Sequence, residues 1–125
     1  MHAKLLIASI MVVATPAAAQ QPRQLEVDLS NFKFQPNQIH LKAGEAVRLH
    51  LVNAASGGHN FTAPDFFAHA RIEPADAKAV VDGSVEIDGR QSRDIVLVPA
   101  RGTYKLRCTH AFHKMFGMSG EIVVD

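Results

Sequence analysis

A short stretch near the C-terminus carries the side chains of this chain that are best suited to bind a soft metal ion. Cys108, His113 and Met118 follow one another at intervals of five residues, and Cys108 is the only cysteine in the sequence. A loop with this spacing can offer a thiolate, an imidazole and a thioether to one point in space. Soft sulfur combined with imidazole suits copper, above all with a second histidine and a weak axial methionine. The spacing therefore predicts a copper site that lacks one ligand.

The missing ligand is a second histidine, and strand alternation sorts the candidates. His40 and His50 alternate with apolar neighbours and are expected to face solvent, as is His69 in a locally helical segment. His59 follows the flexible stretch Ser56–Gly58, which allows its side chain to be aimed. His59 and His110 therefore remain as candidates for the missing ligand.

Each of these residues has an ordinary structural interpretation when it is taken alone. A single cysteine is most often a buried, inert thiol, a histidine beside glycines is usually a turn residue, and Met118 could simply fill the core. Cys108 also continues the inward phase of Tyr104 and Leu106, which predicts a buried sulfur at the end of a strand. It is the combination of cysteine, histidines and methionine that favours a metal site.

The first nineteen residues are typical of a secretory signal peptide. Lys4 gives a positive start, residues 5–14 form an apolar run, and Ala17–Ala19 supply small side chains at a cleavage site. Such a run is too short to span a bilayer as a helix, which takes about 20 residues. We predict a signal peptide over 1–19, a mature domain over 20–125, and a periplasmic or secreted location.

The charge of the predicted mature domain is balanced. Of 13 Lys and Arg residues only Lys4 lies in the leader, which leaves 12 against the 12 Asp and Glu residues. No block of like charge occurs, which argues against a nucleic-acid or anionic-membrane surface. The length corresponds to one domain with one core.

The domain is predicted to be all-β, because apolar residues alternate with polar ones in several short runs. Turn-forming residues separate these runs, which favours a Greek-key β-sandwich or barrel of seven or eight strands. The predicted strands lie around residues 25–29, 39–41, 47–51, 85–87, 95–98, 104–108 and 122–124.

One segment departs from this pattern and predicts a short helical insertion. Residues 65–70 and 74–81 have local helical character, with Pro74 in a first turn and Gly83 just beyond the end. We expect Phe66 and Phe67 to pack this insertion onto the sandwich.

Several motifs resemble those of the cupredoxins, the small blue copper proteins that include plastocyanin, azurin and auracyanin. The stretch from Phe32 to Gly44, with Phe34, Pro36, Ile39 and Leu41, is similar to the opening strands of that family. His59-Asn60 resembles its first copper ligand, Gly102–Cys108 the strand that leads into its cysteine ligand, and Met118–Val124 its closing strand. The resemblance covers nearly the whole mature chain. Ala111 stands where plastocyanin has its histidine, so the loop is closer to azurin-like and auracyanin-like forms.

The resemblance implies one copper ion held by His59, Cys108, His113 and Met118. It also implies that Asn60 supports the site from outside the ligand set, tying the His59 segment to the backbone near Cys108. The expected function is that of a one-electron carrier that is not an enzyme.

The residues around His113 suggest how a redox partner would be met. Phe112, Met115 and Phe116 would form an apolar patch with Lys114 at its rim, suited to a transient redox protein partner. We expect a monomer, and Lys114→Glu should change the association rate while leaving the copper spectrum unaltered.

Three alternatives remain open at this point. A copper carrier or resistance protein would use the same ligands without shuttling electrons. A copper enzyme would need further histidines that converge on a catalytic ion, which His40 and His50 on a solvent face do not provide. An extracellular β-domain without metal is the third.

Overall fold

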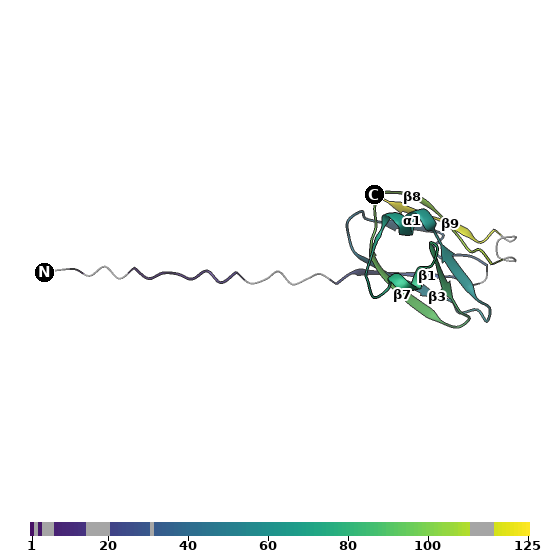
Figure 1. Ribbon diagram of the computed structural model, residues 1–125, viewed down its shortest axis with the longest axis horizontal. Helices are drawn as coiled ribbons and strands as arrows, with labels where there is room; N and C mark the ends of the chain where they lie inside the picture. Colours follow the sequence, from purple (N-terminus) through teal and green to yellow (C-terminus); the bar gives the residue numbers. More distant parts are fainter. Residues whose placement is uncertain (2, 4–6, 15–20, 31, 111–116) are drawn as a thin grey trace.

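Two β-sheets packed face to face form the body of the protein in a computed structural model of residues 1–125 (Figure 1). The structure describes residues 1, 3, 7–14, 21–30, 32–110 and 117–125. One sheet has the strand order β1 (Arg23–Asp28), β3 (Val47–Val52), β7 (Ser92–Val98) and β5 (Arg71–Ile72). The other has the order β2 (Gln38–Leu41), β9 (Ser119–Val124), β8 (Gly102–Arg107), β4 (His59–Thr62) and β6 (Ser84–Ile87).

The strand pairing confirms the predicted all-β sandwich. β1 runs parallel to β3 and β2 parallel to β9, whereas the other neighbouring strands are antiparallel. The described residues contain nine strands where seven or eight were expected. The two strands that sequence alternation did not predict are β4 and the two-residue β5.

The core forms where the apolar phases of the two sheets face each other. On β3, Val47, Leu49 and Leu51 are buried while Arg48 and His50 are partly exposed. Burying such an apolar side chain contributes about 1.5–3 kcal/mol relative to leaving it in water. Aromatic rings add edge-to-face contacts. The rings in contact are those of Phe34 with Phe61, Phe61 with Phe67, Phe66 with Phe67, and Phe66 with Tyr104.

The helical insertion is confirmed in its first half. Helix α1 (Pro64–His69) follows β4 directly, and Phe66 and Phe67 are buried as expected. Pro64 occupies its first turn, where a missing backbone N–H costs nothing.

The predicted helix over 74–81 is wrong. This segment holds only the short 3₁₀ turn η1 (Ala77–Ala79). Its residues are instead tied to β7, because the Glu73 N–H donates to the Val96 carbonyl at 2.9 Å and the Asp76 carboxylate accepts the Val96 N–H at 2.8 Å. The hydrogen bonds of Glu73 and Asp76 to β7 therefore outweigh the helical propensity of this segment.

Gly83 has a different role from the helix end that the sequence predicted. It has a φ of +73° in the tight turn between Val81 and Ser84, which form an antiparallel bridge. A Cβ at Gly83 would approach the Pro64 Cα at 2.5 Å. The glycine therefore allows this turn to pack against the start of α1.

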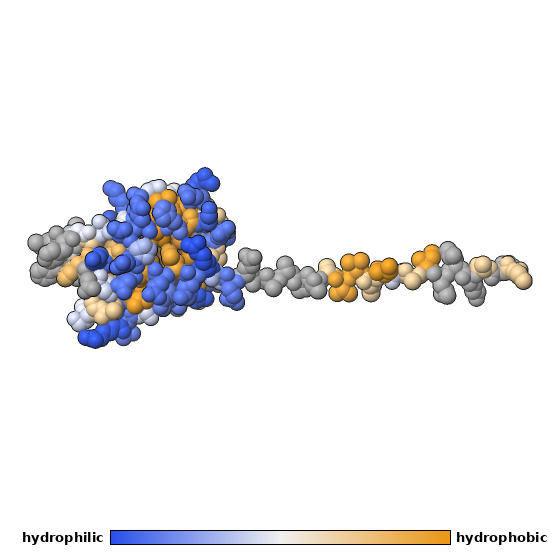
Figure 2. Space-filling model, turned by 180° about the vertical axis from the view of Figure 1, so that it is seen from behind, coloured by the Kyte–Doolittle hydropathy of each residue, from blue (hydrophilic) through white to orange (hydrophobic). Residues whose placement is uncertain are grey.

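Residues 7–14 lie outside the sandwich. Residues 7–14 contain no helix or strand and are exposed, and their hydrophobic side chains extend away from the domain (Figures 1 and 2). Among the residues that the structure describes, no helix is long and apolar enough to cross a bilayer. The signal peptide over 1–19 stays a prediction.

Candidate metal centre

Strand β4 carries His59 into the protein. All four of its residues are buried, and it lies between β6 on one side and β8 on the other. His59 shares the inward face of Phe61, which is fully buried in the core, because alternate residues of a strand point the same way. The His59 side chain is 3% exposed. This position suits a ligand delivered from a rigid strand.

Cys108 lies one residue beyond the end of β8. Its sulfur is completely buried, in phase with Tyr104 and Leu106, as the sequence predicted. The backbone N–H of Asn60 donates to the Cys108 sulfur at 3.4 Å. Since Asn60 follows His59 directly, the structure brings the first predicted ligand segment and the cysteine together at one end of the sandwich.

Met118 approaches from the start of β9. It is 1% exposed, and its carbonyl accepts the backbone N–H of Cys108 at 3.0 Å. The next pair, Arg107 and Ser119, belongs to the β8–β9 ladder. The segment between Cys108 and Met118 is thus closed at its neck by the sheet. His113, the remaining predicted ligand, lies outside the described residues, and so do Phe112, Lys114, Met115 and Phe116 of the predicted partner patch.

Asn60 makes the connection that the family resemblance implied. Its side-chain amide donates to the Thr109 hydroxyl at 2.8 Å, and its side-chain oxygen accepts the Thr109 N–H at 2.9 Å. The Thr62 hydroxyl also donates to that oxygen at 2.8 Å. The residue after Cys108 is therefore bound to the residue after His59. Whether this tie tunes a bound metal stays a prediction.

Asn53 is a structural residue of the site that the sequence analysis missed. It is 1% exposed, and its amide donates to the carbonyls of Gly57 at 2.8 Å and Ile87 at 3.0 Å. Its side-chain oxygen accepts the N–H of Ala55 at 3.0 Å. Asn53 thus holds the stretch that leads into His59. The signal was present, because Asn53 continues the inward phase of Val47, Leu49 and Leu51, where a polar residue is unexpected.

Gly89 packs closely against the stretch that leads into His59. A Cβ at Gly89 would lie 2.0 Å from the Ser56 carbonyl oxygen, so only glycine permits this approach. The Arg90 N–H donates to the Ala55 carbonyl at 2.9 Å in the same turn. The Ser56–Gly58 approach, which the sequence suggested to be flexible, is packed against the β6–β7 turn.

The surroundings of Cys108 favour the neutral thiol in the absence of a metal. Burial raises the pKa of the thiol, and this effect outweighs the backbone hydrogen bonds from Asn60 and His110, which lower it. The negative charge of Glu86 raises it further. A metal ion reverses this balance by binding the thiolate, so its binding would release a proton.

The remaining histidines include His40, His50 and His69, which were all expected to face solvent. His40 and His69 are exposed, and His50 contacts the Asp94 carboxylate on the solvent face of the four-stranded sheet. His110 contacts Glu86 through its Nε2 at 2.7 Å. Within the part of the chain that the structure describes, no group of three or more His, Cys, Asp or Glu side chains is arranged to hold a metal.

The donors that meet at this end of the sandwich fit copper nonetheless. They are a buried thiol sulfur, a buried imidazole and a buried thioether, which is the soft donor set that copper selects. The backbone N–H bond to the Cys108 sulfur also suits a thiolate. We refer to the end of the sandwich that carries Asn53, His59, Cys108 and Met118 as the site pole.

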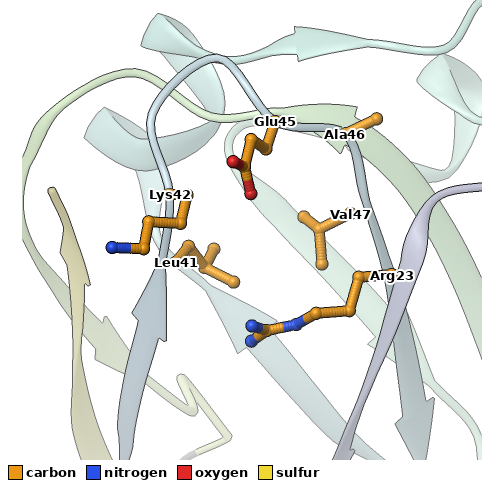
Figure 3. Close-up of a pocket in the computed structure, with 6 residues that line it drawn as sticks. All are labelled: Arg23, Leu41, Lys42, Glu45, Ala46 and Val47. Carbon is orange, nitrogen blue, oxygen red and sulfur yellow. The ribbon is translucent and has the colours of Figure 1, made fainter. Parts of the chain in front are cut away.

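The opposite pole carries a small pocket that is unrelated to this site. Figure 3 shows Arg23 and Glu45 pointing into it from β1 and from the turn between β2 and β3. Its volume is about 20 Å³, roughly the room for one water molecule. The remaining lining residues are Leu41, Lys42, Ala46 and Val47.

Comparison with known proteins identifies the family. Residues 3–124 match the family described as cupredoxin-like domain, so the chain belongs to the cupredoxins. This confirms the resemblance that the motifs carried.

One protein is similar to this chain in sequence and two solved structures are similar to it in fold. The copper-resistant cuproprotein CopI of Pseudomonas aeruginosa is 35% identical over 77 residues, which are 62% of this chain and 42% of CopI. The chain therefore spans less than half the length of that curated relative. Auracyanin B has the same fold with a TM-score of 0.60 and 23% identity, covering 91% of this chain and 93% of auracyanin B. Auracyanin A, a blue copper protein of Chloroflexus aurantiacus, also has a TM-score of 0.60, at 18% identity over 84% of this chain and 100% of its own.

Proposed function

We propose that this protein is exported, binds one copper ion at the site pole and carries single electrons between redox partners. The observation that supports this most directly is the contact between β4 and the buried cysteine, where the Asn60 N–H meets the Cys108 sulfur at 3.4 Å. That contact joins the two segments that carry the strongest predicted donors. The leader-like pattern of residues 1–19 supports export to the periplasm or beyond.

In this proposal four side chains bind the copper ion. His59, Cys108 and His113 would be the strong ligands, and Met118 would be the weak one. Copper would supply the one-electron couple between Cu(I) and Cu(II), and the protein supplies the surroundings. Little has to move on electron transfer if the ligands come from a rigid frame, which is what the hydrogen bonds of Asn60 and Cys108 provide.

Copper handling is the second candidate function. It is favoured by the 35% identity to CopI, whose name records copper resistance. The same ligands would serve, but the ion itself would be the cargo and would have to leave. The buried sulfur and the closed neck of the loop favour a resident ion over a released one. We therefore place electron transfer first.

A copper titration of the metal-free protein tests the site. One equivalent of Cu(II) should produce intense visible absorption from a thiolate–copper bond, and Cys108→Ser should abolish it. His40→Ala is the matched control, because His40 is exposed on β2, outside the site pole, and should leave the spectrum unchanged. A spectrum that survives in Cys108→Ser would refute the proposed site.

Two further measurements separate the candidate functions. An electron carrier should cycle reversibly at an electrode and retain its copper against an excess of a Cu(I) chelator. A copper carrier should lose the ion to that chelator within minutes. Rapid loss together with poor reversibility would favour copper handling.

The absence of an enzymatic role and the monomeric state belong to the same proposal. An electron carrier needs only a transient encounter with a redox protein, for which a small patch around the site suffices. Lys114→Glu should then slow or speed association with that partner while the blue colour persists. Sedimentation at micromolar concentration should show a single chain.

A further inference from the structure

A hydrogen-bonded pair of side chains links the cysteine-bearing loop to the strand beyond His59. His110 Nε2 lies 2.7 Å from Glu86 Oε1, and both side chains are partly exposed. His110 belongs to the loop that starts at Cys108, and Glu86 belongs to β6. The family resemblance gives no role to His110.

The pair crosses the backbone immediately before His59. A Cβ built on Gly58 would lie 3.3 Å from Glu86 Oε1 and 3.4 Å from His110 Cε1. The contact therefore lies over Gly58, so three segments meet there: the loop, the start of β4 and the end of β6.

Two successive loop residues are held by two paired residues of neighbouring strands. Asn60 and Glu86 are opposite each other in the β4–β6 ladder, so their side chains share one face of the sheet. Asn60 binds Thr109, and Glu86 binds His110. The Asn60 contact is expected from the family resemblance, whereas the Glu86 contact was not predicted from it.

The His110 backbone also reaches the sulfur. Its N–H donates to Cys108, and the Glu86 carboxylate lies over Gly58, the residue that directly precedes His59. A change at Glu86 can therefore act in two ways, through the position of the loop and through the charge beside the two predicted ligand segments.

We propose that His110 and Glu86 form a strap over Gly58 that positions the cysteine loop against the His59 strand, and that the Glu86 charge lowers the reduction potential of the site. The inference rests on the proposed copper function and adds two positioning residues to it. A negative charge near the ion favours Cu(II) over Cu(I), because the oxidised ion carries the larger positive charge.

The test compares variants that break the strap with one that removes only the charge. Glu86→Ala and His110→Ala remove the contact. Glu86→Gln keeps a hydrogen-bonding group of the same size without the charge. The control is the other histidine–carboxylate pair of the described chain, His50 with Asp94 at 2.5 Å on β3 and β7, through His50→Ala and Asp94→Asn.

The strap is first measured without copper, by hydrogen exchange of the Thr109 amide, whose N–H is bound to Asn60. A partly exposed hydrogen bond of this kind is expected to change the opening equilibrium by about threefold to fivefold. Exchange should therefore speed up by about that factor in Glu86→Ala and in His110→Ala. The double variant should exchange no faster than either single one, because both remove the same contact. Glu86→Gln and the control variants should match the wild type.

The copper-loaded protein supplies the second readout. Release of copper to a chelator should accelerate in the two alanine variants and not in Glu86→Gln. The reduction potential of Glu86→Gln should move to a more positive value, while Asp94→Asn should leave it in place. A change that was merely structural would not separate these two effects.

The outcomes distinguish the inference from the function on which it rests. A wild-type protein that binds no copper would overturn both the proposed function and the copper half of the inference. Unchanged Thr109 exchange and unchanged copper release in the alanine variants of a copper-binding protein would overturn the strap alone. An unshifted potential in Glu86→Gln would overturn the role of the charge.

Discussion

The two poles of the sandwich are built on opposite principles. At the site pole, polar side chains are buried. All the buried polar residues of the described chain lie at this pole or on β4, and these residues are Asn53, His59, Asn60 and Thr62. The opposite pole is closed by backbone contacts, such as the Ala43 N–H to the Asp125 carbonyl at 2.8 Å. Its charged side chains, Arg23 and Glu45, stay at the surface.

This contrast indicates where the fold accepts an energetic cost. Burying an amide or hydroxyl is unfavourable unless hydrogen bonds compensate it, and the site pole supplies those bonds for Asn53, Asn60 and Thr62. A sandwich alone needs no such network, as the opposite pole demonstrates. The network is therefore best explained by the need to hold the His59 and Cys108 segments in place.

The largest expected effect that tests the contrast comes from Asn53→Ala. The change leaves the carbonyls of Gly57 and Ile87 without their donor and should lower the free energy of unfolding by about 3 kcal/mol. Urea denaturation of the metal-free protein measures it. Asn37→Ala, at an exposed asparagine, should stay within about 0.5 kcal/mol of wild type. Equal effects at the two positions would remove the distinction between the poles.

The second test uses one glycine from each pole. Gly89→Ala forces a Cβ to 2.0 Å from the Ser56 carbonyl and should destabilise by about 2 kcal/mol while disturbing the approach to His59. Gly44→Ala meets open space and suffers only from its φ of +78°, which costs about 1 kcal/mol. Copper affinity should fall in the first variant and not in the second, as read by chelator competition.

A smaller effect is expected from pH. Because burial raises the pKa of the Cys108 thiol in the folded protein, the unfolded chain loses that proton first as the pH rises. The stability from the neutral thiol is complete below the unfolded pKa of about 8.5 and is lost as the pH rises through the folded pKa. Wild-type stability should therefore fall more steeply than that of Cys108→Ser in alkaline solution, with an extra slope of at most about 1.4 kcal/mol for each pH unit. Parallel denaturation series at several pH values would show no divergence if the thiol were not desolvated.

The smallest effect is expected from Glu45→Gln at the opposite pole. Glu45 is exposed beside the small pocket of Figure 3, so stability should change by less than about 0.5 kcal/mol. The copper spectrum should be identical to that of the wild type. A shift in either would mean that the two poles are coupled through the core.

Sequence periodicity predicted the sandwich because most strands have one face exposed to solvent and one face buried in the core. β3 is the clearest case, with Leu49 and Leu51 inward and His50 outward. β4 escaped detection because all four of its residues are buried, which removes the alternation on which the prediction rests. The strand that carries the predicted ligand His59 therefore gives no binary pattern by which it could be detected.

The predicted site depended on residue types more than on pattern. The chain has one cysteine and four methionines, so the spacing of these residues carries information. The structure buries Cys108 and Met118 at one pole. The bonds from Asn53 to the Ile87 and Asp88 carbonyls and the contact between His110 and Glu86 join residues 24 to 35 positions apart. Such pairs depend on strand register, which local sequence does not reveal.

The hydrogen bond between the Cys108 N–H and the Met118 carbonyl has one further consequence. The β8–β9 ladder continues up to that bond, so the sheet is already complete at the point where the connecting segment begins. Insertions, deletions or substitutions in the segment between Cys108 and Met118 should therefore leave the pairing of the strands unchanged. Under the proposed function, the redox partner or the metal preference could then change through this one segment, while the two sheets stay the same.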